Sequence, residues 1–306
     1  MLTLCLSLHR IKEQNNFKVE KLIRFTKMHG AGNDYIYLNG MDNCPDNLGA
    51  LSIAMSDRHK GVGSDGLVVI MPSEVADFRM RMFNADGSEG EMCGNASRCI
   101  GKYVYEKGLS KKRYITLETL AGIKSLSLYV NSDNKVESVT VDMGEPVLDP
   151  SRIPVAYDRD VVKTPISTNF GIFEITAVSM GNPHGVVFVK SLSDTDVHGI
   201  GRELEVNPLF PNKANIEFAQ IIKRDEIIMR VWERGSGETM ACGTGACATL
   251  VAAVIVGSCD RKATIHLLGG DLSIEWNEQN NHVYMTGPAE TVFEGTYIYK
   301  NNNDES

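Results

Sequence analysis

The chain contains two copies of one sequence pattern, and this duplication limits the folds it can adopt. The segment FRMRMFNADGSEGEMCG (78–94) aligns without a gap on IIMRVWERGSGETMACG (227–243). Cys93 therefore matches Cys242 at an offset of 149 residues (242 − 93). A repeat of this length predicts two homologous units that stack on or face each other.

A second landmark follows the same order in both copies. Asn33 precedes Cys93 by 60 residues (93 − 33), and Asn182 precedes Cys242 by the same distance (242 − 182). Asparagine is common in turns, so either residue alone would suggest a turn former. The equal spacing instead favours a role for both asparagines in the site that contains the cysteines.

Each copy has the pattern of several strands and one clear helix. The segment YITLETLAGIKSLSLYV alternates apolar and polar residues around a small-residue turn, which is typical of a hairpin. A helix is predicted after Cys93, with a stop at Gly108, and another after Cys242, with a stop at Gly257. The second helix is apolar on every face and must be surrounded by protein. We predict an α+β fold of two pseudo-symmetric domains, each a strand-rich sheet wrapped around a central helix, with the active site in the cleft between them.

Composition excludes several classes of protein. The 306 residues carry a formal net charge of −8, which argues against binding to nucleic acid or an anionic membrane. No apolar run approaches the roughly 20 residues that span a bilayer. The seven cysteines form an odd set without the paired spacing of a structural zinc site, so we expect no metal, free thiols and a cytoplasmic location.

The two matched cysteines stand where a thiol has a specific chemistry. Each precedes a glycine at a predicted helix start, where unpaired N–H groups and the helix dipole favour a thiolate. The open turns also let a carboxylate approach those N–H groups. Inversion of a stereocentre needs a base on one face of the carbon and an acid on the other, and a thiolate facing a thiol supplies both. The duplication therefore predicts a near-symmetric site for a near-symmetric reaction.

Six motifs in order resemble those of the diaminopimelate epimerases, within the cofactor-independent, two-thiol amino-acid racemases. They are MHGAGND (28–34), RHKGVGSDG (58–66), FNADGSEGEMCGN (83–95), GNPH (181–184), FPNKANIEFAQ (210–220) and ERGSGETMACGTGA (233–246). The resemblance covers about residues 22–300. It implies conversion of LL-2,6-diaminopimelate to the meso form, for lysine and peptidoglycan synthesis, without pyridoxal phosphate or metal.

The resemblance also implies a set of site residues. The acid/base pair would be Cys93 and Cys242, with Glu233 and His184 as an auxiliary pair that sets the protonation state of the thiols. The substrate would be bound by N–H groups and polar side chains of Gly94, Asn95, Gly243 and Thr244, and by Asn33, Asn84, Asn182, Asn215, Glu233 and Arg234. In some members a glutamine after the aspartate of the GxGxD loop touches substrate. Gly66 stands there, so that contact is not carried over.

The resemblance adds a domain division and an assembly. The final strand is expected to return to the first domain, which gives 21–142 plus 289–301 for the N-terminal domain and 143–288 for the C-terminal one. Residues 1–20 are expected to be an extension outside the fold, and the assembly is expected to be a homodimer. We expect Cys99, Cys247 and Cys259 to be packing residues, because cysteine is among the most buried residue types.

Other functions remain open at the level of sequence. A relative on the same scaffold could racemise another amino acid, of the histidine or proline type. A thiol hydrolase or peroxidase would form an adduct on one cysteine and would not need the other. A binding protein would bind amino acids without exchange of their α-hydrogen, although binding alone needs no pair of activated thiols.

Overall fold

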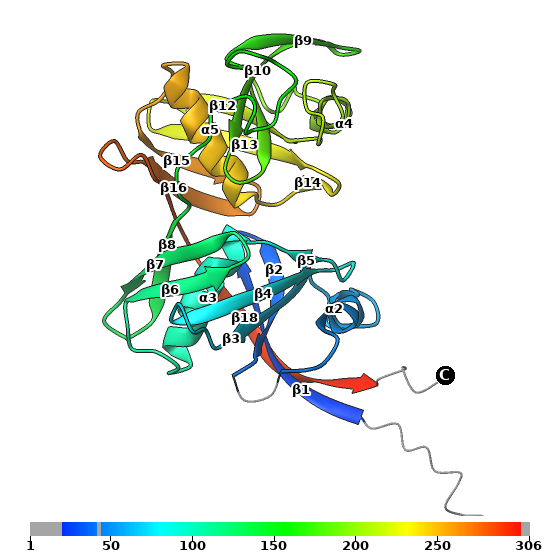
Figure 1. Ribbon diagram of the computed structural model, residues 1–306, viewed down its shortest axis with the longest axis vertical. Coiled ribbons are helices and arrows are strands. Elements are labelled where there is room, and N and C mark those ends of the chain that lie inside the picture. Colours follow the sequence, from blue (N-terminus) through cyan, green and yellow to red (C-terminus); the bar gives the residue numbers. More distant parts are fainter. Residues whose placement is uncertain (1–19, 42–43, 301–306) are drawn as a thin grey trace, which may run out of the picture.

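The computed structural model describes residues 20–41 and 44–300, and the predicted extension lies outside them except for Glu20. Two lobes are stacked along the long axis, each with one central helix (Figure 1). The first lobe comprises β1 (Glu20–Gly30), β2 (Asn33–Asn39), α2 (Leu48–Ser56), β3 (Gly66–Met71), β4 (Phe78–Asn84), β5 (Glu89–Gly90), α3 (Gly94–Glu106), β6 (Tyr114–Thr119), β7 (Gly122–Val130) and β8 (Val136–Asp142).

The second lobe repeats this order, and the last strand returns to the first. Its elements are β9 (Thr164–Thr168), β10 (Gly171–Ser179), β11 (Pro183–Phe188), α4 (Val197–Glu205), β12 (Asn215–Lys223), β13 (Glu226–Glu233), β14 (Gly237–Thr239), α5 (Gly243–Ile255), β15 (Lys262–Leu267), β16 (Gly270–Trp276) and β17 (Val283–Gly287). Strand β18 (Glu290–Lys300) then pairs antiparallel with β1 along its whole length.

Strand pairing repeats with the offset read from the sequence. Strands β2 and β3 are parallel with Tyr35 opposite Gly66, and β11 and β12 are parallel with His184 opposite Asn215. Both pairs differ by 149 residues (184 − 35 and 215 − 66). The antiparallel pairs β3–β4 and β12–β13 keep the same offset, with Leu67 opposite Phe83 and Ile216 opposite Trp232. The parallel pairs β4–β6 and β13–β15 correspond after a one-residue shift, with Phe78 opposite Leu117 and Ile227 opposite Ile265. The predicted duplication and strand-rich α+β fold are confirmed.

The two central helices begin and end where the glycine pattern places them. Helix α3 ends at Glu106, just before Gly108 at φ +72°, and α5 ends at Ile255, just before Gly257 at φ +75°. Left-handed backbone at this position favours glycine and stops the helix. Nearly every residue of α5 is buried, as its uniformly apolar sequence predicts.

The lobes are joined by strand pairing and by one continuous apolar core. Strand β17 pairs with β8, so the sheet continues from one lobe into the other. Side chains of α3 and α5 belong to the same buried cluster, which includes Met143 and Met285 at the junction. This packing fixes the N-termini of both helices at the boundary of the lobes. The domain division at residues 142 and 288 stays a prediction. No helix of the described ranges, 20–41 and 44–300, is long and apolar enough to cross a membrane.

Candidate active site

The two cysteines matched by the repeat occupy the same position in their helices. Cys93 is the N-cap of α3 and its Sγ accepts from the Ala96 N–H at 3.5 Å. Cys242 is the N-cap of α5 and its Sγ accepts from the Gly245 N–H at 3.4 Å. Both have extended backbone at the cap, φ −135° and φ −114° respectively. Two thiols are thus held by equivalent helix N-termini.

Both thiols line one cavity of about 650 Å³ that is built from both lobes. Eleven of the predicted site residues contribute to its wall: Asn33, Asn84, Cys93, Gly94, Asn95, Asn182, Glu233, Arg234, Cys242, Gly243 and Thr244. A second hollow, of about 1070 Å³, shares Asn33, Asn84, Glu233 and Arg234 with it. The structure therefore gathers predicted site residues from four of the six motifs around one space between the lobes.

Each thiol also has one polar side-chain partner. The Cys93 thiol donates to Asn33 Oδ1 at 3.4 Å, and Asn33 Nδ2 donates to Asp65 Oδ2 at 2.8 Å. Cys242 Sγ lies 3.4 Å from Thr244 Oγ1. The Asp65 carboxylate thereby fixes the orientation of the Asn33 amide, with its oxygen toward the thiol.

Two predicted residues lie behind the cavity wall and act through others. Asn215 is buried and its Oδ1 accepts from the Arg234 N–H at 2.9 Å. His184 is fully buried, and its Nε2 lies 3.0 Å from Asn182 Oδ1. These contacts orient Arg234 and Asn182, whose side chains reach the cavity.

His184 and Glu233, expected to act as an auxiliary pair on the thiols, each have a different hydrogen-bond partner. His184 Nδ1 lies 2.7 Å from Glu217 Oε1, on the neighbouring strand β12. Glu233 instead accepts a hydrogen bond from Thr239 Oγ1, and burial raises the pKa of its carboxyl group. The reason is the parallel register of β11 and β12, which brings Glu217 rather than Glu233 to the imidazole.

Burial dominates the ionisation of both thiols. It raises the pKa of Cys93, against the opposing effects of the Ala96 and Asn95 N–H groups and the charge of Arg98. Burial, joined by the charges of Glu233 and Glu217, raises the pKa of Cys242 well above its ordinary value. The N–H groups at the helix starts lower both pKa values, as expected, but desolvation of a buried thiolate is the larger effect.

The remaining thiols of the central helices are packing residues. Burial raises the pKa of Cys99 to about 11 and that of Cys247 to about 12. Cys259 is buried as well. No cluster of three or more potential metal ligands occurs in residues 20–41 and 44–300.

The sequence left two residues of this region unassigned. Glu217 is fully buried, and its Oε2 has no hydrogen-bond partner among the described residues. The sequence indicates it only as a charged residue in the otherwise apolar run IEFA (216–219). Tyr35 lines both hollows, and burial raises the pKa of its hydroxyl well above the ordinary value, with Cys93 and Asp65 contributing. In the sequence, its position two residues after Asn33, on the same face of a strand, could have indicated a place in the site.

Gly66 has a structural reason in this chain. A Cβ there would lie 2.1 Å from the Phe83 carbonyl oxygen and 2.9 Å from Tyr35 Cε1. No side chain fits this position without movement of the backbone. The ring of Tyr35 occupies the space beside Gly66.

We expect Gly66→Ala to lower the free energy of unfolding by about 1–3 kcal/mol, because overpacking displaces buried backbone. The matched control is Gly101→Ala, in α3, where a Cβ would meet its nearest neighbour at 3.4 Å. There we expect no loss, and a gain of up to about 1 kcal/mol from helix propensity. Chemical denaturation of both variants measures the difference. Equal stabilities would contradict the close approach at Gly66.

Comparisons with known proteins agree with this architecture. The family model described as diaminopimelate epimerase matches residues 25–148 and 176–292. The diaminopimelate epimerase of Acetivibrio thermocellus is 59% identical over 274 residues, covering 89% of this chain and 98% of that protein. The diaminopimelate epimerase of Methanococcus maripaludis strain C6 is 54% identical over 274 residues, covering 89% and 99%.

Solved structures show the same two-lobed fold at low sequence identity. A PhzF-family phenazine biosynthesis protein from Bacillus anthracis has a TM-score of 0.66 at 18% identity, covering 91% of this chain and all of that one. A hydroxyproline epimerase from Agrobacterium vitis, solved with trans-4-hydroxy-L-proline, has a TM-score of 0.65 at 16% identity, covering 92% of each. The family model covers well over half of the chain and the curated relatives match it along nearly their full length, so the chain belongs to the diaminopimelate epimerase family.

Proposed function

We propose that this protein epimerises LL-2,6-diaminopimelate to the meso form through a thiol on each face of the α-carbon. The observation that carries the proposal is the pair of thiols, Cys93 and Cys242, at equivalent helix N-termini around one cavity. Membership of the family supports diaminopimelate as the substrate. A cavity of about 650 Å³ is within the usual range for small-molecule sites.

The chemistry needs only groups of this chain. One sulfur, as thiolate, takes the α-proton, and the other, as thiol, returns a proton to the opposite face. The C–H bond is broken and remade with inversion, and the two sulfurs exchange protonation states. The free N–H groups at the starts of α3 and α5 are suited to the α-carboxylate, where negative charge develops in the transition state. No pyridoxal phosphate or metal is required.

The far end of the substrate is assigned to the polar wall of the cavity. Arg234 would bind the distal carboxylate, with Asn84 and Asn182 beside it. Glu233 would receive the distal ammonium. This arrangement distinguishes a diamino diacid from a simple amino acid, because each end of the chain needs its own charged partner.

The substrate is tested by product analysis. Reduced protein, treated with EDTA and free of pyridoxal phosphate, is incubated with LL-diaminopimelate, L-proline or L-histidine, and the stereoisomers are separated chromatographically. We expect meso-diaminopimelate to form and the other two amino acids to stay unchanged. Turnover of proline or histidine but not diaminopimelate would move the protein to the other racemase function.

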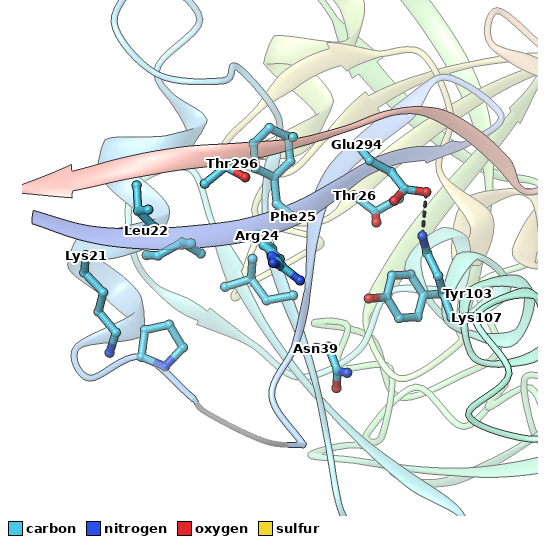
Figure 2. Close-up of a pocket in the computed structure, with 14 residues that line it drawn as sticks. Lys21, Leu22, Arg24, Phe25, Thr26, Asn39, Tyr103, Lys107, Glu294 and Thr296 are labelled. Atoms are coloured by element: carbon cyan, nitrogen blue, oxygen red, sulfur yellow. Dashed lines mark hydrogen bonds and ion pairs between the residues drawn. The ribbon is translucent and has the colours of Figure 1, made fainter.

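We further propose a homodimer that forms through the outer surface of β1 and β18. This strand pair projects from the lower lobe in Figure 1 and exposes Leu22 and Ile298, at 68% and 52% of their surface. Leu22 lines a hollow of about 660 Å³ together with Tyr103, Lys107 and Glu294. Figure 2 shows these side chains, with the Lys107–Glu294 ion pair as a dashed line. Apolar side chains of this exposure favour association.

The assembly is tested by light scattering coupled to size-exclusion chromatography. We expect the mass of a dimer for the unmodified protein and of a monomer for Leu22→Asp combined with Ile298→Asp. The control is Ile172→Asp in β10 of the other lobe, where the side chain is 71% exposed. A monomeric unmodified protein, or dissociation only by the control, would contradict this surface.

A negative net charge supports the absence of nucleic acid and anionic membrane among the partners. The six cysteines of the described ranges are all free thiols, which supports a location in the reducing cytoplasm.

A further inference from the structure

The duplicated site is symmetric in its thiols and asymmetric in its buried charges. Residue 98 is arginine in α3, and the position 149 residues later is Cys247 (98 + 149). Residue 217 is glutamate in β12, and the position 149 residues earlier is Val68 (217 − 149). Both Arg98 and Glu217 are fully buried. Each thiol turn therefore has one buried charge that its counterpart lacks, and the two charges have opposite sign.

Arg98 lies on α3, one turn beyond Cys93, and its guanidinium group is enclosed at the junction of the lobes. It donates through Nη2 to Asn95 Oδ1 at 2.9 Å and through Nε to the Pro288 carbonyl at 3.1 Å. A Cβ on Gly30 would lie 2.9 Å from Nη2, so the backbone closes around the cation. Among the ion pairs of the described residues, none joins Arg98 to a carboxylate. Its charge is therefore uncompensated at the first turn of α3.

The Arg98 contact also fixes the amide that connects the two turns. With its Oδ1 held by Arg98, Asn95 directs its Nδ2 to Asn33 Oδ1 and to the Ala241 carbonyl, both at 3.3 Å. Asn33 Oδ1 also accepts a hydrogen bond from the Cys93 thiol, and Ala241 immediately precedes Cys242 in the sequence. The Asn95 side chain is thus occupied by protein partners.

Glu217 stands on the opposite side, beneath the first turn of α5. A Cβ on Gly245 would lie 2.6 Å from Glu217 Oε1, and Gly245 donates its N–H to Cys242. The same Oε1 contacts His184 Nδ1 at 2.7 Å, while Oε2 has no partner in the described part of the chain. The Glu217 carboxyl group therefore lies directly beside the turn that holds Cys242, with one oxygen unpartnered among the described residues.

We infer that Arg98 and Glu217 are positioning residues that give the two thiols different proton affinities in the free enzyme. Arg98 makes Cys93 the thiol that ionises first, and Glu217 keeps Cys242 protonated. The substrate-free site then presents a base on the α3 side and an acid on the α5 side. This inference rests on the proposed function for its meaning in catalysis, but the difference between the thiols is measurable without any substrate.

The surrounding ionisable groups support this order. Besides Arg98, Cys93 is faced by Glu233 from β13 and Tyr35 from β2, and Asp65 lies behind Asn33, the hydrogen-bond partner of the Cys93 thiol. Cys242 is faced by Glu233 and by Glu217, with His184 behind the latter. Glu233 raises the pKa of both thiols, with a larger effect beside Cys242 than beside Cys93, so it favours the same order. Arg98 lowers the pKa of Cys93, whereas Glu217 raises the pKa of Cys242.

The experiment follows the alkylation of each cysteine with iodoacetamide between pH 6 and 10, with peptide-resolved mass spectrometry. The midpoint is the pH at which a cysteine reaches half of its maximal alkylation rate. In the unmodified protein we expect Cys93 to have a lower midpoint than Cys242. Arg98→Met should raise the Cys93 midpoint by about one unit or more, which is roughly a tenfold slower reaction below it, and Arg98→Lys should restore most of it. Glu217→Gln should lower the Cys242 midpoint by a similar amount.

Matched controls separate charge from loss of structure. Lys102→Met removes a buried cation one turn farther along α3, and Glu205→Gln neutralises a buried carboxylate of the second lobe. Neither should move either midpoint. Equal midpoints in the unmodified protein, a lower one for Cys242, or an unmoved Cys93 midpoint in folded Arg98→Met would overturn the inference. If Arg98→Met does not fold, the inference is tested by the order of the two midpoints in the unmodified protein and by the shift of the Cys242 midpoint in Glu217→Gln.

The outcome is independent of the substrate. An unmoved pair of midpoints beside full epimerisation of diaminopimelate would reject this inference and leave the proposed function intact. Shifted midpoints in a protein that does not turn over diaminopimelate would reject that function and keep the asymmetry of the thiols.

Discussion

Cys93→Ala and Cys242→Ala are each expected to lower kcat/KM for LL-diaminopimelate about a thousandfold or more. Positioned acid–base groups contribute about 10²- to 10⁴-fold each, and inversion requires both in every turnover. Loss of either thiol therefore removes the reaction rather than half of it. The initial rate of meso-diaminopimelate formation, measured for each variant over a range of substrate concentrations, gives kcat/KM.

The matched controls for this prediction lie on the same two helices. Cys99→Ala removes a buried thiol of α3, and Cys247→Ala removes one of α5, neither of which lines the cavity. We expect both controls to keep activity within a few-fold of the unmodified protein. Retained activity in either Cys93→Ala or Cys242→Ala would favour a single-thiol mechanism and would contradict the symmetric site.

Arg234→Met should raise KM for diaminopimelate about ten- to a hundredfold, with the protein still folded. Hydrogen bonds to a charged group contribute about 1.5–3 kcal/mol, which corresponds to this range. Arg234 is well placed for this contact because Asn215 holds its backbone N–H and the Asn212 carbonyl accepts from its Nη1 at 3.1 Å. Steady-state kinetics with LL-diaminopimelate measures the change.

Arg224→Met is the control for the loss of a surface guanidinium. Arg224 is exposed and forms an ion pair with Asp260, away from the cavity. We expect unchanged KM and kcat in this variant. An equal effect of both arginine variants, or a KM unaffected by Arg234→Met, would remove Arg234 from the substrate site.

The duplication made much of this fold predictable from the sequence. The offset between Cys93 and Cys242 also relates the strand pairs Tyr35–Gly66 and His184–Asn215, because homologous units keep their registers. The uniformly apolar helix after Cys242 could only be central. The stops at Gly108 and Gly257 followed from backbone conformation, which the sequence specifies locally.

The parts that could not be predicted depend on contacts between distant strands. The partner of His184 is decided by how β11 lies on β12, and the pattern of either strand alone does not select Glu217 over Glu233. The ionisation of the thiols depends on burial by both lobes, whereas the helix start is a local feature. The enclosure of Arg98 likewise requires Pro288 from the far end of the chain.

The measurement that tests the two-thiol account most directly is the distribution of deuterium during epimerisation in D₂O. LL-diaminopimelate is incubated with reduced protein for less than one tenth of the approach to equilibrium, and substrate and product are separated and analysed by proton NMR and mass spectrometry. The thiol that donates carries solvent deuterium, while the other holds the proton just removed. We therefore predict deuterium at the inverted centre of the meso product and almost none in the recovered LL substrate. Deuterium entering both isomers at the same rate would indicate one base serving both faces and would contradict the account.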